Sequence, residues 1–226
     1  MDEIERVFQK NVPEIPAAVA ANIRVQILRD TSAVRPMPPI SRHALFFGGV
    51  FALLAVVWGA TTGFRGFRVL SPAAAVVLIG SLIVLAIWGG VSAARSMRPG
   101  AGNVYSWIST AVTLVVYETL VLILFNDYSM QLFIHHGMAC LTLGLACAAV
   151  TAVPMLLIAR QGFVVDPTRA GAVIGLMSGL TGLMGLTLRC PLISVPHTGV
   201  WHAAVVPICA IAGALIGRFT RVFQRE

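Results

Sequence analysis

Charged residues are scarce in this chain of 226 residues. They make up 11% of the sequence, whereas hydrophobic residues make up 58% and the mean hydropathy is +0.87. A soluble domain carries about 25% charged residues, so this shortage excludes an ordinary soluble domain. The composition predicts an integral membrane protein whose main solvent is the lipid bilayer.

Acidic residues and lysine are the rarest of the charged side chains. The chain has nine acidic residues, and Lys10 is its only lysine, so arginine supplies almost all of the positive charge behind the net value of +7. The arginines stand singly or in pairs at the ends of apolar runs. Basic residues at such places set the orientation of membrane helices and contact lipid headgroups, so this pattern does not predict direct binding of nucleic acid.

The sequence also lacks the motifs of the common enzyme classes. It contains no nucleophile–base set, no glycine-rich phosphate-binding loop and no paired carboxylates, and we therefore expect no enzymatic activity. Its four cysteines are too few for a disulfide framework. We expect no cleavable signal peptide, because the chain opens with acidic residues and its first long apolar run begins only near His43.

Six apolar runs, each close to the ~20 residues of a spanning helix, follow a polar N-terminal segment. They are Ala44–Thr62, Ala73–Ala94, Tyr105–Phe125, Gly137–Ala159, Ala170–Leu188 and Val200–Gly217. The predicted fold is all-α, a six-transmembrane-helix bundle with a short helical N-terminal arm. The expected domains are the arm and a proline-rich linker over residues 1–43, the transmembrane domain over 44–217 and a basic tail over 218–226.

One of these runs, the fifth, has a face of small residues. Its glycines recur every three or four residues, at Gly171, Gly175, Gly179, Gly182 and Gly185. Glycines at this spacing allow the backbone of a neighbouring helix to approach closely. We therefore expect the fifth span to pack tightly against another span.

The basic residues give the six spans an orientation. With the N-terminus in the cytoplasm, thirteen basic residues lie on the inner side, and three, Arg65, Arg68 and Arg189, lie on the outer side. Basic residues concentrate in cytoplasmic loops. Both termini are therefore expected in the cytoplasm.

Two short amphipathic helices are predicted in the arm. The first runs from Asp2 to about Lys10, and the second begins at Pro16. Their apolar faces consist of Ile4, Val7 and Phe8 in the first helix and Val19, Ile23 and Ile27 in the second. Either face could lie on the membrane surface or bind a protein partner, and the sequence leaves both alternatives open.

Two segments rich in cysteine and histidine lie on the same side of the membrane in this topology. One holds His136 and Cys140 at the start of the fourth span. The other runs from Cys190 through His197 to His202, and we expect it to be a non-helical connection between the fifth and sixth spans. With both termini in the cytoplasm, the two segments meet at the outer face, which predicts a sensing or binding site there.

The chemistry of this site has three alternatives at the level of sequence. Cys140 and Cys190 could form a disulfide if their Cα atoms come within ~7 Å, or they could bind a transient metal ion together with imidazoles, His202 among them. Alternatively, the histidines are interfacial polar residues and the cysteines pack as small hydrophobic residues. We expect no permanent cofactor. Cys147 and Cys209 lie deeper in the apolar runs and are expected to pack in the core.

Glu118 is a lone carboxylate inside an apolar run. An unpaired charge there costs about 3 kcal/mol on insertion scales, so we expect this group to be protonated, paired or exposed to an internal cavity. It suggests an alternative function, a small metal-handling or proton-coupled transporter that uses the outer Cys/His residues and Glu118. A membrane haem protein ligated by His136 and His202 is a further alternative, ranked last because haem ligands usually lie deeper.

Three parts of the sequence together resemble a known family. Arg35-Pro36-Met37-Pro38-Pro39 precedes the six spans, Gly137-Met138-Ala139-Cys140 opens the fourth, and Cys190-Pro191 is followed by His197 and by Val200-Trp201-His202. These parts resemble the membrane anti-sigma factors of the negative-regulator-of-sigma-F (NrsF) family. The resemblance covers the membrane part nearly from end to end.

The resemblance implies a function that the composition does not show. Such proteins hold an extracytoplasmic-function (ECF) sigma factor at the bacterial inner membrane and release it under stress from heavy metals or oxidants. By this resemblance, Cys140 and Cys190 sense the stress, and the arm around Ile4–Leu28 binds the sigma factor. We expect the joining of the two thiols to shift spans four to six against one another and to change how the arm is presented in the cytoplasm.

Overall fold

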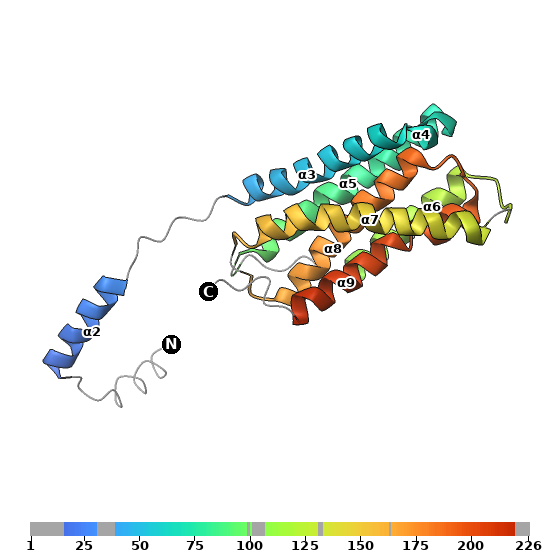
Figure 1. The fold of residues 1–226 in the computed structure, drawn as a ribbon. Helices are drawn as coiled ribbons and strands as arrows, with labels where there is room; N and C mark the ends of the chain where they lie inside the picture. Colours follow the sequence, from blue (N-terminus) through green and yellow to red (C-terminus); the bar gives the residue numbers. More distant parts are fainter. Residues whose placement is uncertain are drawn as a thin grey trace, which may run out of the picture. The chain divides into compact units, whose positions relative to one another are not determined.

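The computed structural model describes residues 16–30, 39–98, 100, 107–130, 133–162 and 164–219. The chain divides into two compact units, Met1–Met37 and Pro38–Glu226. In the first unit, helix α2 spans Ala17–Asp30 (Figure 1), so a helix begins after Pro16 as predicted. Val19 and Ile23 on this helix are exposed. The remaining arm residues singled out above, Ile4, Val7 and Phe8, and the side chain of Ile27, lie outside the described part.

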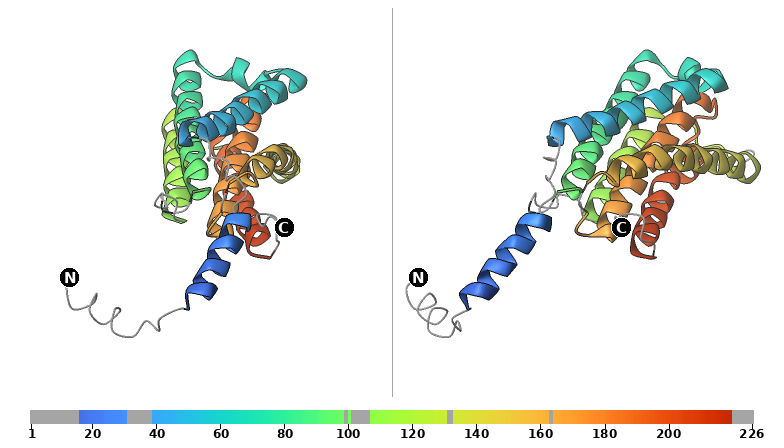
Figure 2. Two further views of the ribbon diagram at one scale, coloured as in Figure 1. Left: turned by 90° about the vertical axis from the view of Figure 1, so that its left-hand side faces the viewer. Right: turned by 60° about the vertical axis from the view of Figure 1, so that its left-hand side comes forward.

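Long helices make up the second unit. They are α3 (Ile40–Thr62), α5 (Pro72–Ser96), α6 (Trp107–Leu124), α7 (Phe133–Ala159) and α8 (Pro167–Arg189), followed by a π-helix η1 (His197–His202) that leads into α9 (Val205–Phe219) (Figures 1 and 2). A short helix α4 (Arg65–Val69) follows α3. Among the described residues, six helices, with η1 and α9 taken together, are long and apolar enough to cross a membrane. The prediction of an all-helical fold with six candidate spans is confirmed, and these helices indicate a multi-pass membrane protein.

Consecutive spans are antiparallel, so the connections between them alternate between two ends of the bundle. One end, here named the α4 end, holds α4, the connection after α6 and the connection from α8 to η1. At the opposite end α3 begins and α9 finishes (Figure 1). This arrangement brings the start of α7, the end of α8 and the start of the sixth span to the α4 end.

Residues at both ends of helix α8 explain where it begins and where it ends. Pro167 occupies its first turn, and the carboxylate of Asp166 accepts a hydrogen bond from the backbone N–H of Arg169 at 3.0 Å. Both are signals of a helix N-terminus. The helix stops at Cys190, whose backbone is extended (φ −77°, ψ 118°). Pro191 is the reason, because a residue that precedes proline is disfavoured in the helical region.

Helix α8 lies at the centre of the bundle. The whole of its apolar window is buried, and it contacts α3, α5, α7 and α9 (Figure 2). A Cβ atom at Gly171 would meet the carbonyl oxygen of Gly213, and one at Gly175 would meet the carbonyl oxygen of Cys209. The backbones of α8 and α9 are therefore in direct contact, as the glycine face of the fifth run predicts.

The connection after Cys190 differs from the prediction. It is extended only over residues 191–194, and helical structure resumes at Val195 and includes both His197 and His202. The prediction of a non-helical segment as far as His202 is therefore wrong. Pro196 fits the first turn of a helix, where its missing N–H is not needed, and the apolar residues that follow allow the span to begin earlier than Val200.

The contact between α8 and α9 gives a first testable prediction. We expect Gly175→Ala to lower the midpoint of thermal unfolding in detergent micelles by several degrees, because overpacking a tight contact costs about 1–3 kcal/mol. Gly80→Ala on α5 is the matched control, since no atom lies within 4 Å of a Cβ built there. Equal unfolding midpoints for the two variants would contradict the close contact.

Candidate functional site

Four side chains at the α4 end form a compact group of metal-binding atoms. Cys140, Cys190, His197 and His202 each offer one ligand atom, and these four atoms all lie within 4.8 Å of one another. We name these residues the Cys/His cluster. Cys140 comes from the second turn of α7, Cys190 from the end of α8, and the two histidines from η1.

The two thiols of the cluster are in contact. The thiol of Cys140 donates a hydrogen bond to the sulfur of Cys190, with a distance of 3.6 Å between the two sulfur atoms. Both cysteines are free. A disulfide bond has a sulfur–sulfur distance of about 2.05 Å, so a movement of roughly 1.5 Å would join them. The structure thus brings together the two cysteines that the sequence singled out.

The π-helix places both histidines of the cluster on one side. His197 and His202 are five residues apart, and in an α-helix residues at this spacing point about 140° apart. In η1 the N–H of Ala203 instead reaches back five residues to the carbonyl oxygen of Thr198, at 3.3 Å, and the wider turn brings residues at a five-residue spacing closer together. The two imidazole rings lie 5.1 Å apart at 75° to each other.

Trp201 holds η1 against α7. A Cβ atom at Gly137 would meet the indole ring of Trp201, so only glycine allows this ring to lie against the helix. The ring of Phe133 contacts the same indole, with 5.5 Å between centroids. The Gly137–Trp201 contact fixes the distance from α7 to η1, and hence from Cys140 to the two histidines.

The position of Cys190 is fixed from the other side by α4. Gly66 of α4 is buried, and a Cβ atom there would lie 2.7 Å from the carbonyl oxygen of Cys190 and would also meet that of Thr187. The following connection is held as well, because the N–H of Val195 donates to the carbonyl oxygen of Asp127 at 2.7 Å. The position of Cys190 therefore depends on backbone contacts among four segments: α4, the end of α8, the connection after α6 and the connection that precedes η1.

Two distances within the cluster fit a tetrahedral metal ion. With metal–sulfur bonds of about 2.3 Å and metal–nitrogen bonds of about 2.05 Å, a tetrahedral site has sulfur–sulfur distances of about 3.8 Å and sulfur–nitrogen distances of about 3.6 Å. The corresponding distances are 3.6 Å between the two sulfurs and 3.5 Å from Cys190 Sγ to His197 Nε2. Two thiolates and two imidazoles suit soft or borderline ions such as Zn²⁺.

His202 supports the same interpretation. Its side chain is 2% exposed, and neither ring nitrogen has a hydrogen-bond partner among the described residues. A buried polar atom without a partner is costly and is usually explained by a bound ion, a water molecule or a functional role. A nitrogen that coordinates a metal ion would no longer need a hydrogen bond.

Cys190 is the more acidic thiol of the pair. The hydrogen bond that Cys140 donates to its sulfur lowers the pKa of Cys190 well below the ordinary range of a thiol, and the neighbouring His197 and His202 lower this pKa further. Burial acts in the opposite direction but does not outweigh them. Cys190 is therefore the thiol of the pair that loses its proton more readily, and the thiolate is the form that attacks oxidants and binds metals.

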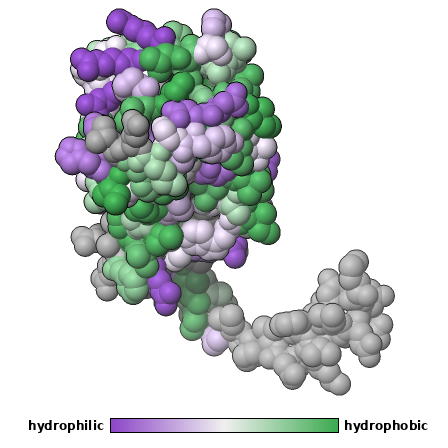
Figure 3. Space-filling model, turned by 90° about the vertical axis from the view of Figure 1, so that its right-hand side faces the viewer, coloured by the Kyte–Doolittle hydropathy of each residue, from purple (hydrophilic) through white to green (hydrophobic). Residues whose placement is uncertain are grey.

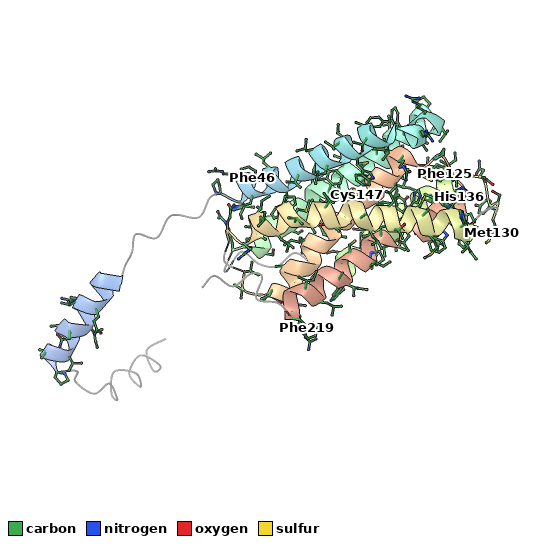
Figure 4. The ribbon with its side chains drawn as sticks, viewed as in Figure 1. Phe46, Phe125, Met130, His136, Cys147 and Phe219 are labelled. Atoms are coloured by element: carbon green, nitrogen blue, oxygen red, sulfur yellow. The ribbon has the colours of Figure 1, made fainter. Side chains whose placement is uncertain are left out.

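The other residues singled out from the sequence lie outside the cluster. His136 is one turn of α7 before Cys140 and lines a cavity that also reaches both thiols, near the right-hand end of α7 in Figure 4. Cys147 is buried deeper in α7, and Cys209 lines an apolar cavity between α7, α8 and α9. Packing of Cys147 in the core was expected.

Glu118 is likewise separate from the cluster. It is half-buried on α6, about 9 Å along the helix from its end at Leu124. A Cβ atom built at Gly199 would lie 2.7 Å from Glu118 Oε2. This carboxylate therefore lies against the π-helix that carries the histidines. Among the described residues no side chain pairs with Glu118, so of the three alternatives predicted for this group, pairing is not observed.

Gly137 and Trp201 have a structural role that the sequence alone did not predict. The signal was the pairing of a glycine three residues before Cys140 with an aromatic residue directly before His202. Only the fold shows that these two residues touch.

A family model described as "Negative regulator of sigma F" (NrsF) matches residues 28–221. No curated protein and no solved structure matches the chain.

The acidity of Cys190 gives the second prediction. We expect its alkylation by iodoacetamide, followed residue by residue with peptide mass spectrometry, to keep a nearly constant rate from pH 8 down to pH 6, because a lowered pKa leaves the thiolate in place over that range. In Cys140→Ala, which removes the donor to Cys190, the rate should fall with decreasing pH. A tenfold fall per pH unit in the unmodified chain would contradict a lowered pKa.

Proposed function

The chain belongs to the NrsF family of negative regulators of sigma F, and we propose that it is a membrane-bound anti-sigma factor of the ECF class, controlled by its Cys/His cluster. Negative regulation of a sigma factor is the family's function, and its members are regulators, not enzymes. The finer proposal is that an ECF sigma factor is bound by the cytoplasmic arm and released when the cluster reacts with a metal ion or an oxidant. The single observation that carries it is the convergence of four ligand atoms within 4.8 Å.

Exposed apolar residues of α2 support a role for the arm in binding. Val19 and Ile23, on one face of this helix, are 46% and 44% exposed, in a unit that is separate from the bundle. An amphipathic helix with an uncovered apolar face suits insertion into a groove of a protein partner. Held at the membrane in this way, a sigma factor is kept from RNA polymerase.

The cluster offers two kinds of chemistry to a stress signal. When the Cys140 thiol and the Cys190 thiolate lose two electrons and one proton to hydrogen peroxide, a disulfide bond joins α7 to the end of α8, and the peroxide takes a second proton from solvent and leaves as two water molecules. A soft metal ion can instead bind both thiolates and both imidazoles. Oxidation shortens one distance in the cluster, whereas metal binding also draws η1 toward the thiols.

Either event changes the balance between arrangements of the last three spans. The ligands come from α7, α8 and the start of the α9 span, so a bond among them favours the arrangement in which these segments are closest. A ligand shifts such a balance only through its different affinity for the two arrangements. With the N-terminus in the cytoplasm, the cluster lies at the outer face and the shift carries the signal to the inner face.

The arm is the subject of the third prediction. We expect deletion of residues 1–30 to abolish co-purification of the sigma factor while the bundle still inserts into the membrane, because the bundle is a separate compact unit. A matched variant, Val19→Asp with Ile23→Asp, should reduce binding at least tenfold in a pull-down from solubilised membranes. Full retention of the sigma factor by the truncated chain would exclude the arm as the binding element.

The cluster is the subject of the fourth prediction, which separates its two chemistries. In proteoliposomes loaded with the sigma factor, Cys140→Ser with Cys190→Ser should hold the sigma factor but release it neither on addition of hydrogen peroxide nor on addition of Cd²⁺. His197→Ala with His202→Ala should lose the response to Cd²⁺ and keep the response to peroxide, because a disulfide needs only the thiols.

His135→Ala is the control for the histidine variants, since His135 is exposed and outside the cluster. It should respond to both reagents like the unmodified chain. Binding of Co²⁺, whose visible spectrum reports a tetrahedral thiolate site, measures metal capture without the sigma factor. Normal release by both reagents in the double serine variant would remove the sensing role of the thiols.

A further inference from the structure

A cavity of about 520 Å³ at the α4 end leads to both thiols of the cluster. It lies between the end of α3, α4, the start of α7 and the end of α8. The residues that matter for its chemistry are Arg65, His136, Cys140, Arg189 and Cys190. We name this cavity the thiol vestibule. The histidines of the cluster do not line it, so the thiols have the vestibule on one side and buried imidazoles on the other.

The charge of the vestibule has one sign. Arg65 and Arg189 are its charged lining residues besides the titratable thiols, and none of the described residues that line it is acidic. Neither arginine forms an ion pair with any residue in the described part of the chain. Figure 3 views the bundle from this end, and hydrophilic side chains gather in its upper part, where α4 lies.

Two further observations show that the vestibule suits an anion close to the thiols. Arg189 lies near enough to Cys140 to interact electrostatically with its thiol. His136 lines the vestibule, and its ring nitrogen Nδ1 is buried without a hydrogen-bond partner in the described residues. Guanidinium groups bind planar oxyanions such as carboxylates, phosphates and sulfonates through two parallel hydrogen bonds.

We infer that the thiol vestibule is an anion-binding site formed by Arg65, Arg189 and His136, and that it selects small, negatively charged, thiol-reactive molecules for reaction with the cluster. The role of this selection in signalling rests on the proposed function. A positively charged reagent of equal reactivity is repelled by both arginines. A soft metal ion that uses this route travels best as a complex with net negative charge.

Charge selection also resolves a conflict in the site. A reacting thiolate repels anions, although many oxidants and sulfur-transfer reagents are anionic. Two guanidinium groups line the same cavity as the thiols, and their positive charge attracts an anion toward the sulfur with which it reacts. The arginines act in binding and orientation, and the reacting atom remains the sulfur.

Methanethiosulfonate reagents test this inference, because they differ in charge and share one reaction. The thiolate attacks the sulfenyl sulfur, a mixed disulfide forms, and methanesulfinate leaves with the electron pair of the broken sulfur–sulfur bond. We would compare the anionic 2-sulfonatoethyl reagent with the cationic 2-(trimethylammonio)ethyl reagent on the full chain in proteoliposomes. Peptide mass spectrometry measures modification at Cys140 and Cys190, and each rate is divided by the rate with free 2-mercaptoethanol.

In the unmodified chain we expect the normalised anionic rate to exceed the cationic rate at least tenfold, and the excess to shrink with added salt because salt screens exposed charges. Arg65→Ala with Arg189→Ala should reduce this ratio about tenfold. Arg68→Ala is the matched control, since Arg68 lies on the same short helix α4 and does not line the cavity. It should leave the ratio unchanged.

A ratio of one or less, a ratio independent of salt, or an equal loss in Arg68→Ala would overturn the inference. The neutral methyl reagent checks folding, because its rate should be the same in all variants, and the salt dependence of the unmodified chain decides the question even if the double variant does not fold. No sigma factor is present in this assay. Sigma release is measured in the separate assay of the fourth prediction. Charge selection here without release there would refute the proposed function and leave the anion site standing. Release there without charge selection here would refute the anion site and leave the proposed function standing.

Discussion

Direct contact between the backbones of α8 and α9 is the constraint on which the rest of this structure depends. Gly171 lies against Gly213, and Gly175 against Cys209, so the two helices approach more closely than side chains normally allow. Cys190 ends the first of these helices, and η1 opens the span of the second. The backbone contact runs from Gly217 against Pro167 to Gly179 against Val206, and it aligns the two spans that carry Cys190 and the two histidines at the α4 end.

The cluster joins two environments that favour different chemistry. Towards the vestibule the thiols meet arginine side chains and a cavity large enough for small polar molecules. On the other side they meet His197 and His202, which are 3% and 2% exposed. A reagent that reacts only with the sulfur atoms needs access from the vestibule. A metal ion that binds all four ligands also needs the imidazoles of His197 and His202. Under the proposed function, an oxidant and a metal ion would link different numbers of segments at one site.

Much of the fold could be predicted from the sequence, because a spanning helix needs little more than length and apolar character. The six runs were located to within a few residues, and the glycines of Ala170–Leu188 predicted its close packing. The meeting of Cys140 and Cys190 followed only as a possibility, since topology places two residues at one end without fixing their distance. The structure reduces this to a sulfur–sulfur contact of 3.6 Å.

The histidine geometry could not be predicted, and the reason is physical. Residues five apart do not share a face of an α-helix, so the spacing of His197 and His202 gave no signal of two adjacent ligands, and the segment was assigned as non-helical. Conversely, His136 is the histidine closest in sequence to Cys140, yet it lines the vestibule and is not part of the cluster. Local spacing predicts contacts only when the helix type is known, and the π-turn changes that type.

The complete burial of α8 also bears on biogenesis. Its apolar window has a mean hydropathy of 1.6, the lowest of the six spans, and its glycines leave polar backbone atoms uncovered by side chains. A nascent chain that has delivered α8 to the translocon still lacks α9, the span that covers this backbone most closely. Lateral release of α8 into lipid is thus least favourable until synthesis reaches Phe219, and an incompletely translated chain contains neither a sheltered fifth span nor a complete Cys/His cluster.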